Sequence, residues 1–235
     1  KIGRVITDQC YVGAVQRGGR TYEHSVPALV GNRQRILVSE LSGQSNIIQT
    51  AHEMGIDLQK STEGARILQT IKQKENQGYF FEAADGSLEL LIRRELGQHR
   101  DFFNVIKYRV SVEVTEAGNL WTEATVRVQV NGDVLYEVAD GDGPVNALDS
   151  ALRKALTQKY PQLADVHLRD YKVRIIDSRM GTAAQTRVLI ESGDHTTGKE
   201  WITIGVSENI IHASFEALKD SIDYRLLLDE LDTGK

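Results

Sequence analysis

The second half of the chain carries the same order of residues twice. Three strand-like runs followed by a helix occupy residues 108–159, and the same order returns in residues 170–228. The step from Tyr108 to Tyr171 equals the step from Asn146 to Asn209, whereas the middle strands at 125–130 and 186–191 need a slightly shorter one. A repeat of this length is too long for a solenoid and predicts a duplicated small α+β unit. Such a duplication leaves a pseudo-symmetric seam, which is a natural place for a small regulatory ligand.

Hydrophobic spacing predicts the elements of each copy. Valines alternate with polar residues in two runs, which is typical of strands with one buried face: Val110, Val112 and Val114, then Val126, Val128 and Val130. The helices expected at 145–158 and 209–227 each carry an apolar stripe. The predicted fold class is therefore α+β, with small helical linker subdomains followed by a duplicated βββα domain. That domain has two three-stranded antiparallel sheets with helices on one side.

Three domains are expected along the chain. Residues 1–57 form a first linker subdomain, with a strand at 35–39 and a helix at 45–54 that stops at Gly55. Residues 58–102 form a helical linker subdomain, in which Asp85 or Ser87 is the N-cap of the second helix and Gly97 follows its last turn. The aromatic run at 79–81 between its helices is interpreted as core packing. Residues 103–235 form the duplicated domain.

Composition and residue spacing exclude several classes of function. A net charge of −5 argues against a nucleic-acid partner. No apolar run approaches the ~18 residues needed to span a membrane, so no membrane partner is expected. Cys10 is the single cysteine, so neither a disulfide framework nor a cysteine zinc site is expected, and a cytoplasmic location fits. The six histidines lack metal-ligand spacing, and the serines at 39, 42 and 45 lack a nearby histidine and acid. We therefore expect no catalytic and no metal-binding residues.

The glycine-rich turn at 140–144 is the most suggestive local motif. Gly141 and Gly143 permit a tight strand-to-helix turn, and Pro144 suits the first helical position. The N–H groups of Val145, Asn146 and Ala147 would then be free to bind a carboxylate. An ordinary Gly-Pro turn explains these residues equally well, so both interpretations stay open at this point.

Several segments together resemble a known family. TYEH at 21–24, VPALVGNR at 26–33 and LVSELSGQSN at 37–46 look like the region after the catalytic barrel in citramalate synthases, which belong to the α-isopropylmalate/homocitrate synthase family. The similarity continues through segments 78–84, 141–148, 170–174, 181–184 and 205–211. No single motif is specific, but their shared order makes chance agreement a poor explanation.

The resemblance implies a role for the chain. Family members condense acetyl-CoA with a 2-oxo acid in an N-terminal barrel that holds a divalent metal. Linker subdomains follow, and then a regulatory domain of two βββα units that binds leucine or isoleucine near its dimer interface. We therefore expect a C-terminal regulatory and dimerisation segment that forms a homodimer and takes no cofactor itself. The alternative is a stand-alone amino-acid-sensing or assembly module.

The chain also departs from the family pattern. The barrel is missing from the sequence, Tyr11 stands where a histidine is usual, and residues 1–10 do not resemble the family. The chain is then either a regulatory fragment with an altered start or part of a protein that has lost catalysis. In both cases we expect it to be inactive as a synthase on its own.

An effector site is predicted from the turn and the second copy. The turn N–H groups would hold the carboxylate of a branched-chain amino acid, and Asp170 or carbonyls of residues 181–184 would hold its ammonium. Isoleucine is the first choice and leucine the second. The expected effector-binding residues are Gly141, Gly143, Pro144, Val145, Asn146, Ala147, Asp170, Tyr171, Val173, Thr182 and Ala184.

Overall fold

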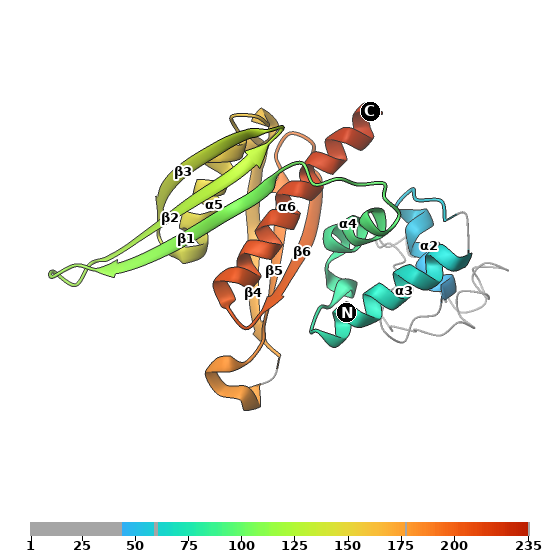
Figure 1. Ribbon diagram of the computed structural model, residues 1–235, viewed down its shortest axis with the longest axis horizontal. Coiled ribbons are helices and arrows are strands. Elements are labelled where there is room, and N and C mark those ends of the chain that lie inside the picture. Colours follow the sequence, from blue (N-terminus) through green and yellow to red (C-terminus); the bar gives the residue numbers. More distant parts are fainter. Residues whose placement is uncertain (1–43, 59–60, 177, 235) are drawn as a thin grey trace, which may run out of the picture. The chain divides into compact units, whose positions relative to one another are not determined.

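A computed structural model describes residues 44–58, 61–176 and 178–234 of the chain (Figure 1). The chain forms two compact units, one of residues 1–83 with 91–98 and the other of residues 84–90 with 99–235. The strand expected at 35–39 lies outside the described residues. Among the helices that are described, none is both long enough and apolar enough to cross a membrane.

The first unit is helical in its described part. It contains α2 (Gln44–Glu53), α3 (Ser61–Asn76), the short 3-10 turn η2 (Phe81–Ala83) and the C-terminal half of α4 (Asp85–Glu95). Gly55 and Gly97 follow α2 and α4 with φ of 71° and 67°, the left-handed conformation that ends helices. Both predicted helix stops are therefore confirmed. Phe81 is buried and its ring stacks on that of Tyr79, whereas Phe80 is partly exposed.

The second unit contains the two predicted sheets. The first copy consists of β1 (Asn104–Val114), β2 (Leu120–Val130), β3 (Asp133–Gly141) and α5 (Pro144–Leu156). After η3 (Pro161–Asp165), the second copy consists of β4 (Val166–Ile175), η4 (Ser178–Ala183), β5 (Thr186–Asp194), β6 (Glu200–Ser207) and α6 (Ile210–Thr233). Each sheet is antiparallel, in the orders β1-β2-β3 and β4-β5-β6. The predicted α+β fold of two three-stranded sheets with helices is confirmed.

The strand registers correct the predicted alignment of the two copies. A bulge follows Val105 in β1, and another follows Leu168 at the corresponding place in β4. Tyr108 pairs with Val126 and Tyr171 pairs with Ile190, so the middle strands need a slightly longer step than the first strands, not a shorter one. The number of residues between the starts of the two helices is larger still. It grows because the loop before the third strand is longer in the second copy.

One pairing of residues made from the sequence is consequently wrong. Asn209 is the N-cap of α6, whereas Asn146 is the third residue of α5. The residue equivalent to Asn209 is Gly143, the N-cap of α5. The match between the spacing of the two asparagines and that of the two tyrosines is therefore a coincidence.

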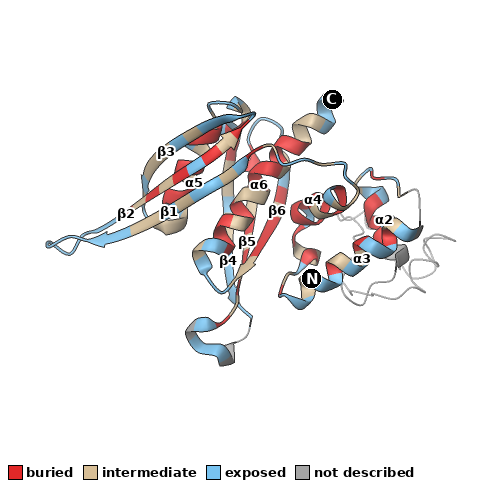
Figure 2. Cartoon of the chain, viewed as in Figure 1, coloured by how far each residue is buried: buried red, intermediate tan, exposed pale blue. Residues whose placement is uncertain are grey.

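Each copy buries one face of its sheet against its helix (Figure 2). Alternate residues of β2 from Ala124 to Val130 are fully buried and pack in one cluster with the apolar stripe of α5. In the second copy, Val188 and Ile190 of β5 pack with Ala213, Ala217 and Leu218 of α6. The buried face of β2 matches the alternation read from the sequence. The valine run of β1 does not, because Val112 and Val114 are 49% and 69% exposed.

The start of α4 covers the free edge of the second sheet. Asp85 accepts a hydrogen bond from Ile202 N at 2.8 Å, and the Ser87 hydroxyl accepts one from Ile204 N at 3.0 Å. Both donors belong to the edge strand β6, whose unpaired N–H groups need partners. The predicted N-cap role of these two residues is wrong, because Leu88 N donates to the carbonyl of Ala84, which makes Ala84 the N-cap.

Candidate effector site

The turn between β3 and α5 has the backbone expected of a helix start. Gly143 is extended and no side chain caps the helix, while Pro144 occupies the first helical position. Ala147 N donates to the Gly143 carbonyl at 2.9 Å, so the prediction that this N–H is free is wrong. The N–H groups of Val145 and Asn146 belong to the first turn, where the helix supplies no carbonyl partner. They are the two donors that a ligand could use.

The equivalent turn of the second copy is closed by its own residue. The Asn209 side chain accepts hydrogen bonds from Ile211 N at 2.9 Å and from His212 N at 3.2 Å. Asn146 instead turns back and accepts from Asp142 N at 3.1 Å, which braces the loop and leaves the helix end uncapped. The two copies therefore differ at the place where an anion would bind.

The two glycines of the turn have different roles. A Cβ on Gly141 would lie 2.4 Å from Ala147 N, so only glycine allows β3 and α5 to approach this closely. A Cβ on Gly143 would meet no atom within 4 Å. Gly143 therefore faces open space at the N-cap of α5.

An apolar wall lies beside this helix start. Val145 packs, together with Leu168 and Tyr171, against the cluster formed by Val188, Ile190, Ala213, Ala217 and Leu218. The Tyr171 hydroxyl lies 2.7 Å from the Ser214 hydroxyl on α6. Val173 is on the same face of β4 and is 42% exposed, so the wall continues to the surface. The structure thus packs Val145 and Tyr171 against the same cluster, although they are distant in sequence.

Asp170 points away from this wall. It pairs with Glu191 across the strands and forms an ion pair with Lys172 on the outer face of the sheet. The hydrogen bond from Lys172 holds the pKa of the Asp170 carboxyl below its usual value. Because adjacent strand residues face opposite sides, Asp170 and Tyr171 do not share a pocket. The structure therefore does not bring Asp170 together with Tyr171 on one face of the sheet.

The remaining predicted residues lie in or after η4. Ala184 is buried, and its N–H donates to the Gly181 carbonyl at 3.2 Å. Gly181 has a positive φ of 59°, which places an irregular backbone at this turn. The Thr182 side chain lies outside the described part of the structure.

Sequence reasoning missed the residues of the seam between the copies. The Tyr108 ring stacks on Phe215 with centroids 4.2 Å apart, and its hydroxyl lies 2.8 Å from His212 Nδ1. Burial, with a smaller effect of the Glu216 carboxylate, raises the pKa of Tyr108. The first turns of α6 thus contact both tyrosines. The repeat makes Tyr108 and Tyr171 equivalent positions, and this equivalence is the signal that could have placed Tyr108 at the seam.

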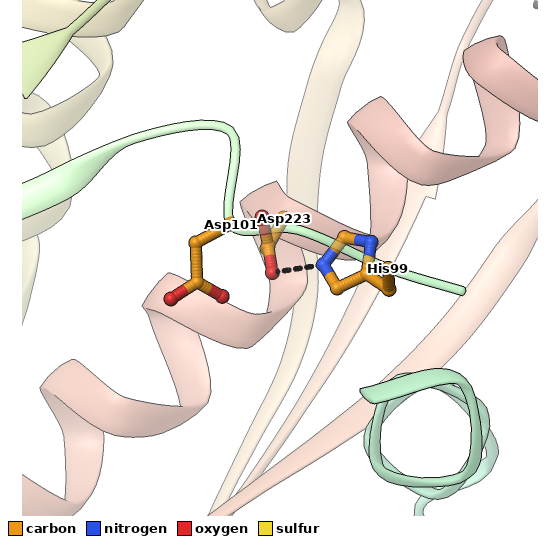
Figure 3. A group of neighbouring side chains, drawn as sticks. All are labelled: His99, Asp101 and Asp223. Atoms are coloured by element: carbon orange, nitrogen blue, oxygen red, sulfur yellow. Dashed lines mark hydrogen bonds and ion pairs between the residues drawn. The ribbon is translucent and has the colours of Figure 1, made fainter. Parts of the chain in front are cut away.

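A second cluster of polar groups joins α6 to the segment before β1 (Figure 3). His99 Nε2 lies 2.8 Å from Asp223 Oδ2, and Asp223 Oδ1 accepts from Phe102 N at 3.2 Å. One ligand atom from each of His99, Asp101 and Asp223 lies within 4.8 Å of the others, a spacing that a metal ion could bridge. Both Asp223 oxygens already accept hydrogen bonds, and Lys219 pairs with Asp101. We therefore interpret the cluster as a structural link.

Comparison with known proteins places the chain in a family. The model of the LeuA allosteric (dimerisation) domain matches residues 82–226. The chain belongs to this family. This LeuA allosteric domain and its flanking residues are 52% identical over 218 residues to an (R)-citramalate synthase of Geobacter sulfurreducens, covering 92% of the chain and 41% of that protein. The identity to an (R)-citramalate synthase of Synechocystis sp. is 50% over 223 residues, covering 93% of the chain and 40% of that protein.

A relative with lower identity is named as a 2-isopropylmalate synthase instead of a citramalate synthase. A 2-isopropylmalate synthase of Clostridium kluyveri is 27% identical over 207 residues, covering 86% of the chain and 37% of that protein. The chain therefore spans about two fifths of the length of the curated relatives it matches. The family resemblance read from the sequence is confirmed.

Proposed function

We propose that this LeuA allosteric domain is the regulatory segment of a citramalate synthase and binds an end-product branched-chain amino acid for feedback inhibition. The observation that carries the proposal is the uncapped start of α5 beside an apolar wall. Two free N–H groups at a helix start favour a carboxylate. Val145 and Tyr171 offer the adjacent surface that a branched side chain would bury.

The effector chemistry follows from these contacts. The carboxylate would accept from Val145 N and Asn146 N, and the alkyl group would lie on the wall. Because Asp170 is engaged by Lys172 on the opposite face, main-chain carbonyls of the η4 turn remain the candidates for the ammonium. Isoleucine is the first choice, since the identity to the citramalate synthases of Geobacter sulfurreducens and Synechocystis sp. is much higher than to the 2-isopropylmalate synthase of Clostridium kluyveri. Leucine is the second.

A thermal shift assay tests effector binding. Isoleucine, leucine and valine should be titrated in parallel against the chain. For specific binding, ligand at 100 times its Kd adds about 2.7 kcal/mol to the free energy of unfolding, a rise of several degrees in Tm. Gly143→Val should abolish the shift, because its side chain would fill the open space at the N-cap of α5, where the carboxylate is proposed to bind.

The matched control is Glu208→Val, which places the same side chain in the equivalent exposed turn before α6. This variant should keep the full shift. No shift in the wild-type protein with any of the three amino acids would refute the sensor role. A full shift in Gly143→Val would leave binding possible but would move it away from this turn.

We further propose that a second copy of the chain covers the exposed apolar ends of the sheets. The hairpin of β1 and β2 extends past β3 (Figure 1), and its helix-side face exposes Val112, Val114 and Leu120. In the second copy, Val173 and Ile175 are exposed on the corresponding face. The outer faces of the sheets carry many charged residues and are therefore a poorer apolar interface. A symmetric dimer that buries the apolar ends would cover well over ~1,000 Å².

Sedimentation tests this dimer. Val114→Asp should lower the dimer fraction at micromolar concentration, because it puts a charge into the proposed interface. Val114 is 69% exposed, so the substitution should not unfold the protein. Glu113→Gln, on the opposite face of the same strand, is the control and should leave the dimer intact. A monomeric wild-type protein, or a Val114→Asp dimer as tight as wild type, would count against the proposal.

A further inference from the structure

The outer face of the first sheet carries a group of basic side chains around a hollow. Lys107 and Arg109 of β1 and Arg127 of β2 line this hollow of about 370 Å³, together with Thr125 and Tyr136. All three basic residues are exposed. We call this group the basic hollow. It stands out because the chain as a whole has a net charge of −5.

The strand register forces the positive charges together. Lys107 is directly opposite Arg127, and Arg127 is in turn opposite Tyr136 on β3. Like charges directly opposite each other across an antiparallel pair destabilise the sheet. An anion bound between the two cations would remove this repulsion.

Within the described part of the chain, no carboxylate neutralises the basic hollow. None of its three cationic side chains forms a hydrogen bond or an ion pair there. Other lysines of the same unit are paired, such as Lys154 with Glu137 at 3.1 Å and Lys159 with Asp133 at 2.6 Å. Carboxylates therefore pair with other lysines on this surface, whereas the three cations of the basic hollow have no carboxylate partner among the described residues.

The second copy shows that the fold does not require this charge. The positions of Lys107 and Arg127 are taken there by Asp170 and Glu191, which also pair directly. Asp170 is neutralised by Lys172, and Glu191 lies 3.6 Å from Arg169. The second face thus pairs both of these acidic residues with its own cations. It has no surplus negative charge to offer the basic hollow of another copy, which favours a free anion over a protein contact.

We propose that the basic hollow binds a phosphate-bearing ligand with a planar ring, of the nucleoside diphosphate class. Guanidinium groups bind phosphate oxygens through paired, charge-assisted hydrogen bonds, and three cations match the charge of a diphosphate. The hollow is larger than an inorganic phosphate needs. Tyr136 is 58% exposed beside Arg127 and offers a ring on which a base stacks. This site is separate from the α5 turn and does not depend on the proposed amino-acid effector.

Calorimetric titration of the full chain with ADP, pyrophosphate and adenosine tests the proposal. ADP should bind most tightly, pyrophosphate more weakly, and adenosine not measurably, and added salt should weaken binding. Arg127→Gln and Lys107→Gln should each weaken ADP binding about ten-fold or more. Tyr136→Ala should reduce ADP binding to the level of pyrophosphate.

The matched control is Arg174→Gln, which removes an exposed cation from the outer face of the second sheet. This variant should bind ADP as wild type does. Unchanged ADP binding in Arg127→Gln and Lys107→Gln would overturn the site, and equal binding of ADP and pyrophosphate to wild type would overturn the planar ring. If these two variants dissociate a dimer and the wild type binds no anion, the face is a protein contact and the proposal fails.

Discussion

Replacing Asp223 should be among the most damaging single changes in the second unit. The side chains of His99 and Asp223 are both fully buried, and the Asp223 carboxylate accepts from His99 Nε2 and from Phe102 N. Asp223→Ala leaves both donors buried without their partner. Each buried donor without an acceptor costs about 1–3 kcal/mol, so we expect a loss of about 3–5 kcal/mol in the free energy of unfolding.

Asp223→Asn separates the two contacts. Its amide oxygen can accept from one donor, while its NH₂ group faces the other. The expected loss is therefore about 1–3 kcal/mol, smaller than for alanine. Asp101→Asn is the control, because Asp101 is half exposed and its ion pair with Lys219 is a surface pair worth at most about 1 kcal/mol.

Urea unfolding monitored by circular dichroism measures these differences. A loss for Asp223→Ala no larger than that for Asp101→Asn would show that Asp223 is not a structural link. A chelator should leave the unfolding midpoint of the wild-type protein unchanged. A clear drop on chelation would mean that His99, Asp101 and Asp223 hold a metal ion, and that the structural interpretation of the cluster is wrong.

Three further outcomes are expected. Gly141→Ala should destabilise the protein by about 1–3 kcal/mol because its Cβ overlaps Ala147 N, whereas Gly143→Ala should change unfolding by less than about 0.5 kcal/mol. Tyr171→Phe should cost about 1 kcal/mol in urea unfolding through loss of the Ser214 contact, and a neutral result would contradict that role. Burial alone would raise the pKa of Asp194, but hydrogen bonds from Thr197 N, Arg225 and Thr196 N together lower it. Its stabilisation should therefore be present above pH ~4 and disappear as pH falls below that value, so Asp194→Asn should flatten the stability profile in acid; an unchanged acid slope would refute this.

The duplicated fold could be predicted from sequence because it depends on local patterns. The alternation of Val126, Val128 and Val130 reports a buried sheet face directly, and Gly55 and Gly97 end helices through their own backbone preferences. The alignment of the copies was less accessible. A longer loop in the second copy shifts the later elements, so equal spacing of two asparagines did not mean equal positions.

The candidate site was only partly predictable for a related reason. The turn from Gly141 to Pro144 carries its conformation in its residue types, and its position was correct. Asp170 and Tyr171 are both predicted to contact the effector, but adjacent strand residues face opposite sides, and the structure places these two on different faces. The contacts of His99 with Asp223 and of Asp85 with β6 join residues more than a hundred positions apart. Such contacts depend on how the elements pack, and no local pattern reports them.

The different caps of the two helices also bear on stoichiometry. A duplicated domain would ordinarily offer two equivalent positions for one kind of ligand. In α6 the Asn209 oxygen already occupies the place that an incoming carboxylate would take, whereas Gly143 leaves that place open in α5. Of the two duplicated helices, only α5 thus has an N-terminus open to the proposed carboxylate. Titration with the branched-chain amino acid should accordingly show one bound ligand per protomer, and therefore two bound ligands per symmetric dimer.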